Sequence, residues 1–147
     1  MERQRIASLR HVGMDFNGRL VLREVSFDLY PGEIVALMGP SGCGKTTVLR
    51  ILIGLLEASR GELEIFGTPV HRNTPRELLV GLRRRMGVVF QNGALFDSLT
   101  VGDNVAFPLR HCLDVRVTAA IRAKTQHILA AVDLPGVENE YSAELSG

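Results

Sequence analysis

The sequence predicts an α/β fold with an antiparallel β addition in front of its core and a helical addition behind it. Two segments of alternating apolar residues, joined by a short turn, predict paired antiparallel strands at the start of the chain. A continuous apolar run then ends at a glycine-rich loop that leads into an apolar helical pattern, which is typical of a parallel core. The last third of the chain shows helical periodicity.

The β addition is expected to be a hairpin. Residues 6–16 and 20–30 are the predicted strands, and Asn17-Gly18 between them is a strong signal for a tight turn. Pro31-Gly32 predicts a second turn, which ends the hairpin.

The core is expected to begin with the apolar run at 34–38, which predicts a strand buried on both faces. The helix predicted over 45–56 is apolar around most of its circumference, so we expect it to be buried on several sides. Residues 61–66 and 86–90 are the other predicted strands.

The helices of the second half carry recognisable start signals. Thr74-Pro75-Arg76-Glu77 predicts a capping box with Thr74 as the cap, and Thr100-Val101-Gly102-Asp103 predicts another. Arg83-Arg84-Arg85 is expected to be the solvated end of a helix. Residues 118–132 predict an amphipathic helix whose apolar stripe is Ile121, Ile128, Leu129 and Val132.

The composition excludes several classes of protein. The chain has 147 residues, 46% of them hydrophobic, so it is long enough for one domain with a core and is not disordered. A net charge of +1 argues against a nucleic-acid partner. No apolar run reaches the length of a membrane span, and two cysteines predict reduced thiols in a cytosolic chain.

The glycine-rich loop matches the pattern G-x-x-x-x-G-K-[ST], which binds nucleotide phosphates. Its residues are Gly39, Pro40, Ser41, Gly42, Cys43, Gly44, Lys45, Thr46 and Thr47. Glycines let successive backbone N–H groups point at phosphate oxygens, and the following helix adds its dipole. A glycine-rich turn that merely precedes a helix is the alternative interpretation.

Two side chains of this loop have expected roles toward ATP and Mg²⁺. Lys45 would supply a compact charge to the β- and γ-phosphates, and the Thr46 hydroxyl would ligate Mg²⁺. Only two of the 17 basic residues are lysines, and one of them stands at this position. Arginine would not replace it, because a planar guanidinium is too bulky for so tight a loop.

Beyond this loop the chain resembles the ATP-binding-cassette (ABC) ATPases. That resemblance implies a P-loop NTPase (RecA-like) core with an antiparallel β-subdomain and the start of an α-helical subdomain. It implies that Phe16 stacks on adenine, that Gln91 contacts Mg²⁺ or the attacking water, and that Leu145-Ser146-Gly147 begins a signature motif. Ser146 and Gly147 would then contact ATP bound by a second subunit in a head-to-tail dimer. Phe16 as a core residue and Gln91 as an ordinary loop residue are the alternatives.

The resemblance also implies that residues 1–147 form an incomplete nucleotide-binding domain, with the β-subdomain and core at 1–92 and the helical subdomain at 93–147. The second half of the family's domain, with its magnesium-binding Asp, catalytic Glu and switch His, does not appear in the sequence. We therefore expect little or no ATPase activity from this polypeptide, and an apolar edge exposed at residues 34–38. Two interpretations are open: the sequence is a fragment of an active subunit, or it is a natural truncation.

Residues 90–110 resemble the ATPase subunit of Mla-type phospholipid transporters. This implies a permease that docks on residues 93–109, a lipid-binding partner, and a place on the cytoplasmic face of the inner membrane. Leu95, Phe96, Leu99, Val105 and Phe107 would form the docking groove or, for at least three of them, the helical core. Another ABC importer, for amino acids or metals, and a truncated fragment that binds nucleotide without hydrolysis are the alternatives.

Overall fold

The computed structural model describes residues 4–91, 93–112 and 117–145. The chain divides into two compact units, Met1–Gly87 and Val88–Gly147, and each is described by itself. Among the described residues, no helix is both long enough and apolar enough to cross a membrane.

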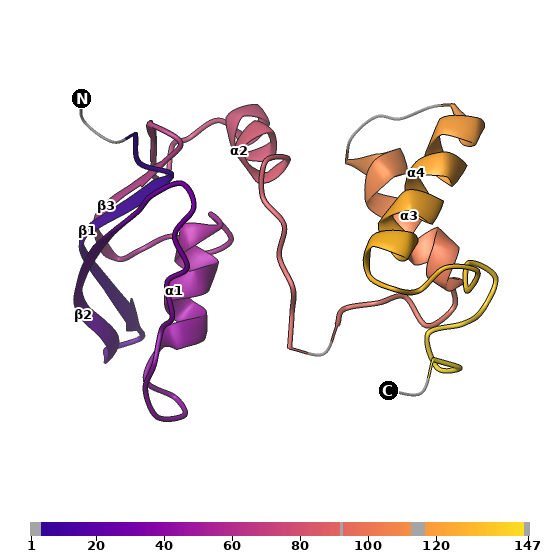
Figure 1. Cartoon of the computed structure of the whole chain (residues 1–147). Coiled ribbons are helices and arrows are strands. Elements are labelled where there is room, and N and C mark those ends of the chain that lie inside the picture. Colours follow the sequence, from indigo (N-terminus) through magenta and orange to yellow (C-terminus); the bar gives the residue numbers. More distant parts are fainter. Residues whose placement is uncertain (1–3, 92, 113–116, 146–147) are drawn as a thin grey trace. The chain divides into compact units, whose positions relative to one another are not determined.

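The first unit is built on a four-stranded antiparallel sheet in the order β2-β1-β3-β4 (Figure 1). Its strands are β1 (Ala7–Phe16), β2 (Arg19–Leu29), β3 (Arg60–Ile65) and β4 (Thr68–Val70). The predicted hairpin is confirmed: β1 pairs with β2, and Asn17 and Gly18 both have positive φ (51° and 86°). A two-residue turn with positive φ at both positions matches the right-handed twist of the strands it joins.

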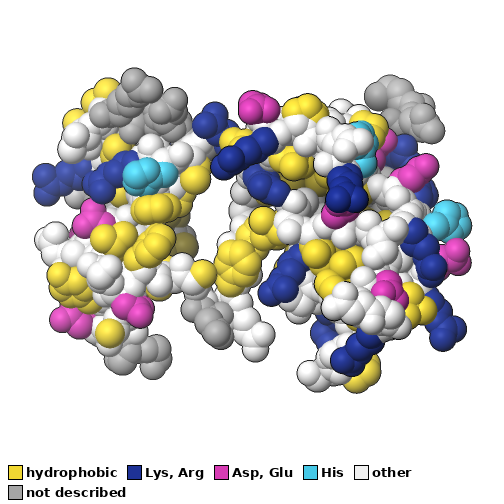
Figure 2. Space-filling model, turned by 180° about the vertical axis from the view of Figure 1, so that it is seen from behind, with side chains coloured by type: hydrophobic (Ala, Val, Ile, Leu, Met, Phe, Trp, Pro, Cys, Tyr) yellow, Lys and Arg dark blue, Asp and Glu magenta, His cyan; other side chains and the backbone are white. Residues whose placement is uncertain are grey.

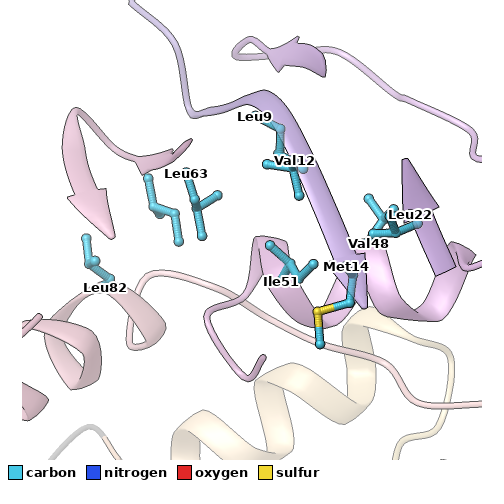
Figure 3. Packing of buried hydrophobic residues seen from close by; sticks show 9 residues of the cluster. Leu9, Val12, Met14, Leu22, Val48, Ile51, Leu63 and Leu82 are labelled. Carbon is cyan, nitrogen blue, oxygen red and sulfur yellow. The ribbon is translucent and has the colours of Figure 1, made fainter. Parts of the chain in front are cut away.

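One face of the sheet packs against α1 (Lys45–Leu52), as Figure 3 shows in close-up. Leu9 and Val12 of β1 meet Ile51 and Val48 of the helix in this core. The helix is shorter than predicted and is buried on one side only, since Leu49 on another side is exposed. The expectation of burial on several sides was therefore wrong for the described residues.

The helix α2 (Arg76–Arg83) begins one residue later than predicted, with Pro75 at the cap position. The Thr74 hydroxyl does not cap it, because it accepts a hydrogen bond from the His71 backbone N–H at 2.8 Å. The first capping box was therefore wrong: the hydroxyl is engaged in the turn that precedes the helix.

The arginines at the end of α2 are not simply solvated. Arg83 donates to the carbonyl oxygens of Ile53 and Gly54, just past the end of α1. Arg85 lies over the ring of Phe66, with its guanidinium carbon 3.7 Å from the ring centroid, which is a cation–π contact. These contacts tie α2 to α1 and to the end of β3.

The two predicted core strands do not form. Residues 34–38 and 86–90 have no strand assignment, and Ile34 and Met38 are 99% and 89% exposed. A strand needs a hydrogen-bonded neighbour, and the described part of the chain supplies none to either segment. The apolar side chains at 34–38 are exposed as predicted, but they lie on a segment without strand structure and not on a sheet edge.

The second unit contains α3 (Val101–His111) and α4 (Thr118–Ala131), which lie side by side (Figure 1). Thr100 caps α3 as predicted, accepting a hydrogen bond from the Asp103 backbone N–H at 3.1 Å. Ala106 and Leu109 of α3 pack with Ile121 of α4. Leu129 is buried as predicted, whereas Ile128 and Val132 are exposed.

Candidate functional site

The glycine-rich loop lies between the exposed segment 34–38 and α1, in the first unit. Gly44 is the residue that positions it: its φ is +99°, and a Cβ added there would lie 2.6 Å from Leu22 Cδ2. Side chains disfavour this φ, and the packing against β2 leaves no room for one. A glycine is therefore required where the loop passes into the helix.

The N-terminus of α1 presents free backbone N–H groups at the loop. Gly44 stands at the cap position and provides no side chain to accept from them. The first N–H groups of an α-helix have no carbonyl partner within the helix, and the helix dipole adds partial positive charge at this end. The backbone of Lys45, Thr46 and Thr47 therefore forms a site suited to an anion.

Lys45 adds a full charge to this site. Its Nζ donates to the carbonyl oxygens of Gly39 and Pro40, both at 2.8 Å, and lies 3.8 Å from Cys43 Sγ. The side chain thus bends back over the loop from the first turn of the helix. Within the described residues no carboxylate forms a salt bridge with Lys45. In the part of the chain that the structure describes, its ammonium is held by two neutral carbonyls and the Cys43 sulfur, and an anion can replace them.

A phosphate-bound Mg²⁺ fits the residues present. Mg²⁺ keeps several waters and phosphate oxygens as ligands and needs few from the protein. The exposed Thr46 offers one hydroxyl oxygen, and in the described residues no cluster of three His, Cys, Asp or Glu forms a separate metal site. In ATP-binding loops of this pattern the bound metal neutralises charge on the β- and γ-phosphates.

The other predicted site residues lie in different parts of the chain. Phe16 is 43% exposed at the end of β1, in the hairpin whose second strand packs on Gly44. Gln91 is exposed and belongs to the second unit, whereas the loop belongs to the first. Ser146 and Gly147 lie outside the described residues.

Sequence reasoning missed the residues that support the loop. Val21 and Leu22 of β2 contact the position of Gly44, and Arg83 binds the carbonyls after α1. Alternation along β2 marks Leu22 as an inward-facing position, so a signal for it exists in the sequence. Arg83 has no such signal, because its partners are backbone carbonyls 29 and 30 residues away.

Comparison with known protein families shows to which family the chain belongs. The family model described as ABC transporter matches residues 22–147. The chain belongs to the ABC transporter family. The fold class predicted from the sequence, a P-loop ABC ATPase fold with an antiparallel sheet and helices, is thereby confirmed.

Individual relatives agree with this assignment. A sulfate/thiosulfate import ATP-binding protein of Pseudomonas aeruginosa is 40% identical over 141 residues, covering 95% of this chain and 41% of that protein. A spermidine/putrescine import ATP-binding protein of Spiroplasma citri is 39% identical over 150 residues, 97% of this chain and 38% of that protein. The chloroplastic Arabidopsis thaliana protein TRIGALACTOSYLDIACYLGLYCEROL 3 is 44% identical over 138 residues, which cover 94% of this chain and 39% of that protein.

A solved structure supports the fold as well. A dimeric ATP-binding cassette, described as a post-hydrolysis state bound to ADP and Pi, superimposes with a TM-score of 0.82 at 28% identity, covering 95% of this chain and 63% of that one. The chain spans about two fifths of the length of the curated relatives it matches. The comparisons support an ABC ATP-binding subunit, and the Mla-type specificity predicted from residues 90–110 is not shown by them.

Proposed function

We propose that this chain is the ATP-binding subunit of an ABC importer and that it binds MgATP at Gly39–Thr47. The observation that carries the proposal is the loop itself: Lys45 Nζ rests 2.8 Å from two loop carbonyls, above the free N-terminus of α1. The loop brings together backbone amide groups, the positive end of a helix dipole and a single ammonium. These are the groups that bind polyphosphate.

The roles within the site follow from residue chemistry. Lys45 exchanges its two carbonyl partners for phosphate oxygens when ATP binds, and Thr46 ligates Mg²⁺. Phe16, half-exposed at the end of β1, provides an aromatic face for adenine. Gln91 contacts Mg²⁺ or the attacking water, and Ser146 and Gly147 act on the nucleotide of a second subunit.

The transported substrate is proposed to be a small solute. The relatives described above include importers of sulfate or thiosulfate and of spermidine or putrescine. This differs from the phospholipid cargo that residues 90–110 suggest, and from the amino acids and metals considered as alternatives.

A lipid is the second candidate substrate. One specific observation favours it: the Arabidopsis relative, 44% identical, has a name containing trigalactosyldiacylglycerol, which is a glycolipid. Only this candidate implies a lipid-binding partner protein.

The proposed partners are a membrane permease and a second ATP-binding subunit. The permease would dock on the surface after Gln91, where Leu95 and Phe96 are exposed. The second subunit would pair head to tail, in line with the dimeric cassette of similar fold. The protein would then act on the cytoplasmic face of the membrane, without spanning it.

The substrate proposal is tested by disrupting the coding sequence in its source cell. Uptake of radiolabelled sulfate and of radiolabelled spermidine is measured, together with the distribution of labelled phospholipid between membranes. Loss of one solute's uptake, restored by the wild-type gene and not by K45A, supports the importer. A change in phospholipid distribution with both uptakes intact would replace it with the lipid candidate.

A further inference from the structure

The loop that follows Gln91 is fastened to α3 by the side chain of Asn104. Its Oδ1 accepts a hydrogen bond from the Phe96 backbone N–H at 2.8 Å, and its Nδ2 donates to the Phe96 carbonyl at 3.1 Å. The carboxamide therefore satisfies both backbone polar groups of Phe96, as the peptide group of a neighbouring strand would.

The same Nδ2 group also reaches the end of the loop. It lies 3.2 Å from the carbonyl oxygen of Leu99 and 3.1 Å from that of Thr100, so its two hydrogens are shared among three carbonyl oxygens. One half-buried side chain thus holds Phe96 and the last two residues before α3. Removing it would take away the hydrogen bonds to the Phe96 N–H and the Leu99 carbonyl, whereas the Phe96 and Thr100 carbonyls would keep the backbone N–H groups of Leu99 and Asn104 as donors.

This arrangement is not needed to begin the helix. Thr100 already caps α3 by accepting from the Asp103 N–H, and the backbone N–H of Asn104 donates to the Thr100 carbonyl at 2.9 Å. The side chain of Asn104 is therefore free to act on the loop alone.

The loop carries two apolar side chains that remain open to solvent. Leu95 is 56% exposed and Phe96 is 47% exposed, although the Phe96 ring also packs on Phe107 with centroids 4.7 Å apart. Figure 2 shows apolar side chains on the visible surface of both units, beside interspersed basic and acidic ones. Ala94, just before this pair, has a positive φ of 52°, a conformation that needs support from its surroundings.

We propose that Asn104 is a positioning residue for partner binding: it holds Leu95 and Phe96 in the orientation in which they dock on the membrane permease. This inference rests on the proposed function, which places the permease on the surface after Gln91. Holding the loop before binding removes the entropy cost of ordering it during binding, so affinity rises without any new contact.

The local part of the proposal is tested by hydrogen exchange. We expect the Phe96 amide to exchange faster in N104A and unchanged in N139A, where an exposed asparagine of the same unit is replaced. N104D keeps an acceptor for the Phe96 N–H but cannot donate to the three carbonyls. We therefore expect the Leu99 amide to exchange faster in N104D than in the wild type. An unchanged Phe96 amide in N104A would overturn the proposal.

Partner binding is tested with inside-out membrane vesicles from the source cell, stripped of peripheral proteins, and the labelled full chain. Vesicles treated with trypsin and protein-free liposomes of the same lipids separate a protein partner from the lipid surface. We expect saturable binding to untreated vesicles only, weakened about tenfold by F96A, by N104A and by N104D, and unchanged by N139A.

The double variant distinguishes positioning from general damage. If Asn104 acts through Phe96, N104A/F96A will bind no more weakly than F96A alone, because the two residues form one unit. Additive losses, or wild-type binding by N104A or N104D, would overturn the inference and leave the proposed function in place. Failure of the wild-type chain to bind trypsin-sensitive sites would contradict the proposed permease partner and with it this inference.

Discussion

The transition from loop to helix at Gly44 requires a residue without a side chain. A φ of +99° is open to glycine, and the neighbouring Leu22 leaves no space for a Cβ. Lys45 follows directly, so any shift at Gly44 moves the ammonium and the first helical amides together. The backbone conformation of this loop can be predicted from the sequence, because the glycines that require it and the lysine that follows are neighbours in one short pattern.

We predict that G44A lowers stability by about 1–3 kcal/mol and abolishes ATP binding, because it combines a strained φ with an overlap on Leu22. G81A is the matched control: Gly81 lies inside α2, has no positive φ, and has nothing within 4 Å of an added Cβ. We expect it to stabilise by up to about 1 kcal/mol. Urea unfolding and ATP titration measure both, and equal behaviour of the two variants would contradict the geometry.

The loop cysteine provides a second test at this scale. Cys43 is exposed and its Sγ lies 3.8 Å from Lys45 Nζ, whereas the other thiol, Cys112, is exposed in the second unit. We predict that alkylation by iodoacetamide abolishes ATP binding in C112S and leaves it intact in C43S, and that bound ATP slows the reaction at Cys43. Equal ATP binding by alkylated and untreated C112S would refute this.

At the scale of elements, local signals were the reliable ones. The Asn17-Gly18 hairpin and the Thr100 cap were predicted because turn and cap chemistry is contained within four residues. The strands at 34–38 and 86–90 were not correct, because a strand depends on a neighbour that local sequence does not show. The Thr74 cap failed for a different reason: its hydroxyl accepts from the His71 N–H, three residues before it, and this local partner competes with capping.

The β1–β2 pair contains an ion pair whose carboxylate has a lowered pKa. Arg10 Nη2 lies 2.7 Å from both carboxylate oxygens of Asp28. The hydrogen bond from Arg10, and then that from Ser8, lowers the pKa of Asp28 below its ordinary value of 3.8. A lowered folded-state pKa means that the unfolded chain binds the proton more readily, so the carboxylate stabilises the fold at higher pH.

We predict that this contribution is complete above about pH 5 and is lost as the pH falls through 3.8 and then through the lower folded-state pKa of Asp28. D28N should be less stable than the wild type at pH 7 and should show a shallower loss in that acidic range. D97N, at an exposed aspartate of the second unit, is the control. Urea unfolding from pH 2.5 to 7 measures all three, and parallel curves for D28N and the wild type would exclude the role of Asp28.

At the scale of the whole molecule, the predicted site residues fall in two units, each of which is described by itself. The phosphate loop and Phe16 belong to Met1–Gly87, and Gln91 belongs to Val88–Gly147. The loop pattern is contiguous in the sequence and is recognised from its own residues, whereas Phe16 and Gln91 were named only through the family resemblance. The near-neutral charge fits the proposed binding of one nucleotide through backbone amides and a single lysine.

We predict that the purified 147-residue polypeptide does not turn over ATP. Phosphoryl transfer needs a residue that positions water and full charge neutralisation, and the acidic pair expected after the signature does not occur in this sequence. Phosphate release from radiolabelled ATP measures this. Turnover that disappears in K45A would contradict the prediction.

The central claim, that Gly39–Thr47 binds the phosphates of ATP through Lys45, is tested most directly by equilibrium binding of a fluorescent ATP analogue. The matched variants are K45A and K124A, which remove the only two lysines of the chain in turn. We predict that K45A binds about 10- to 100-fold more weakly, as expected for a lost charged hydrogen bond, and that K124A binds like the wild type. Equal affinity of K45A and the wild-type chain would contradict the claim.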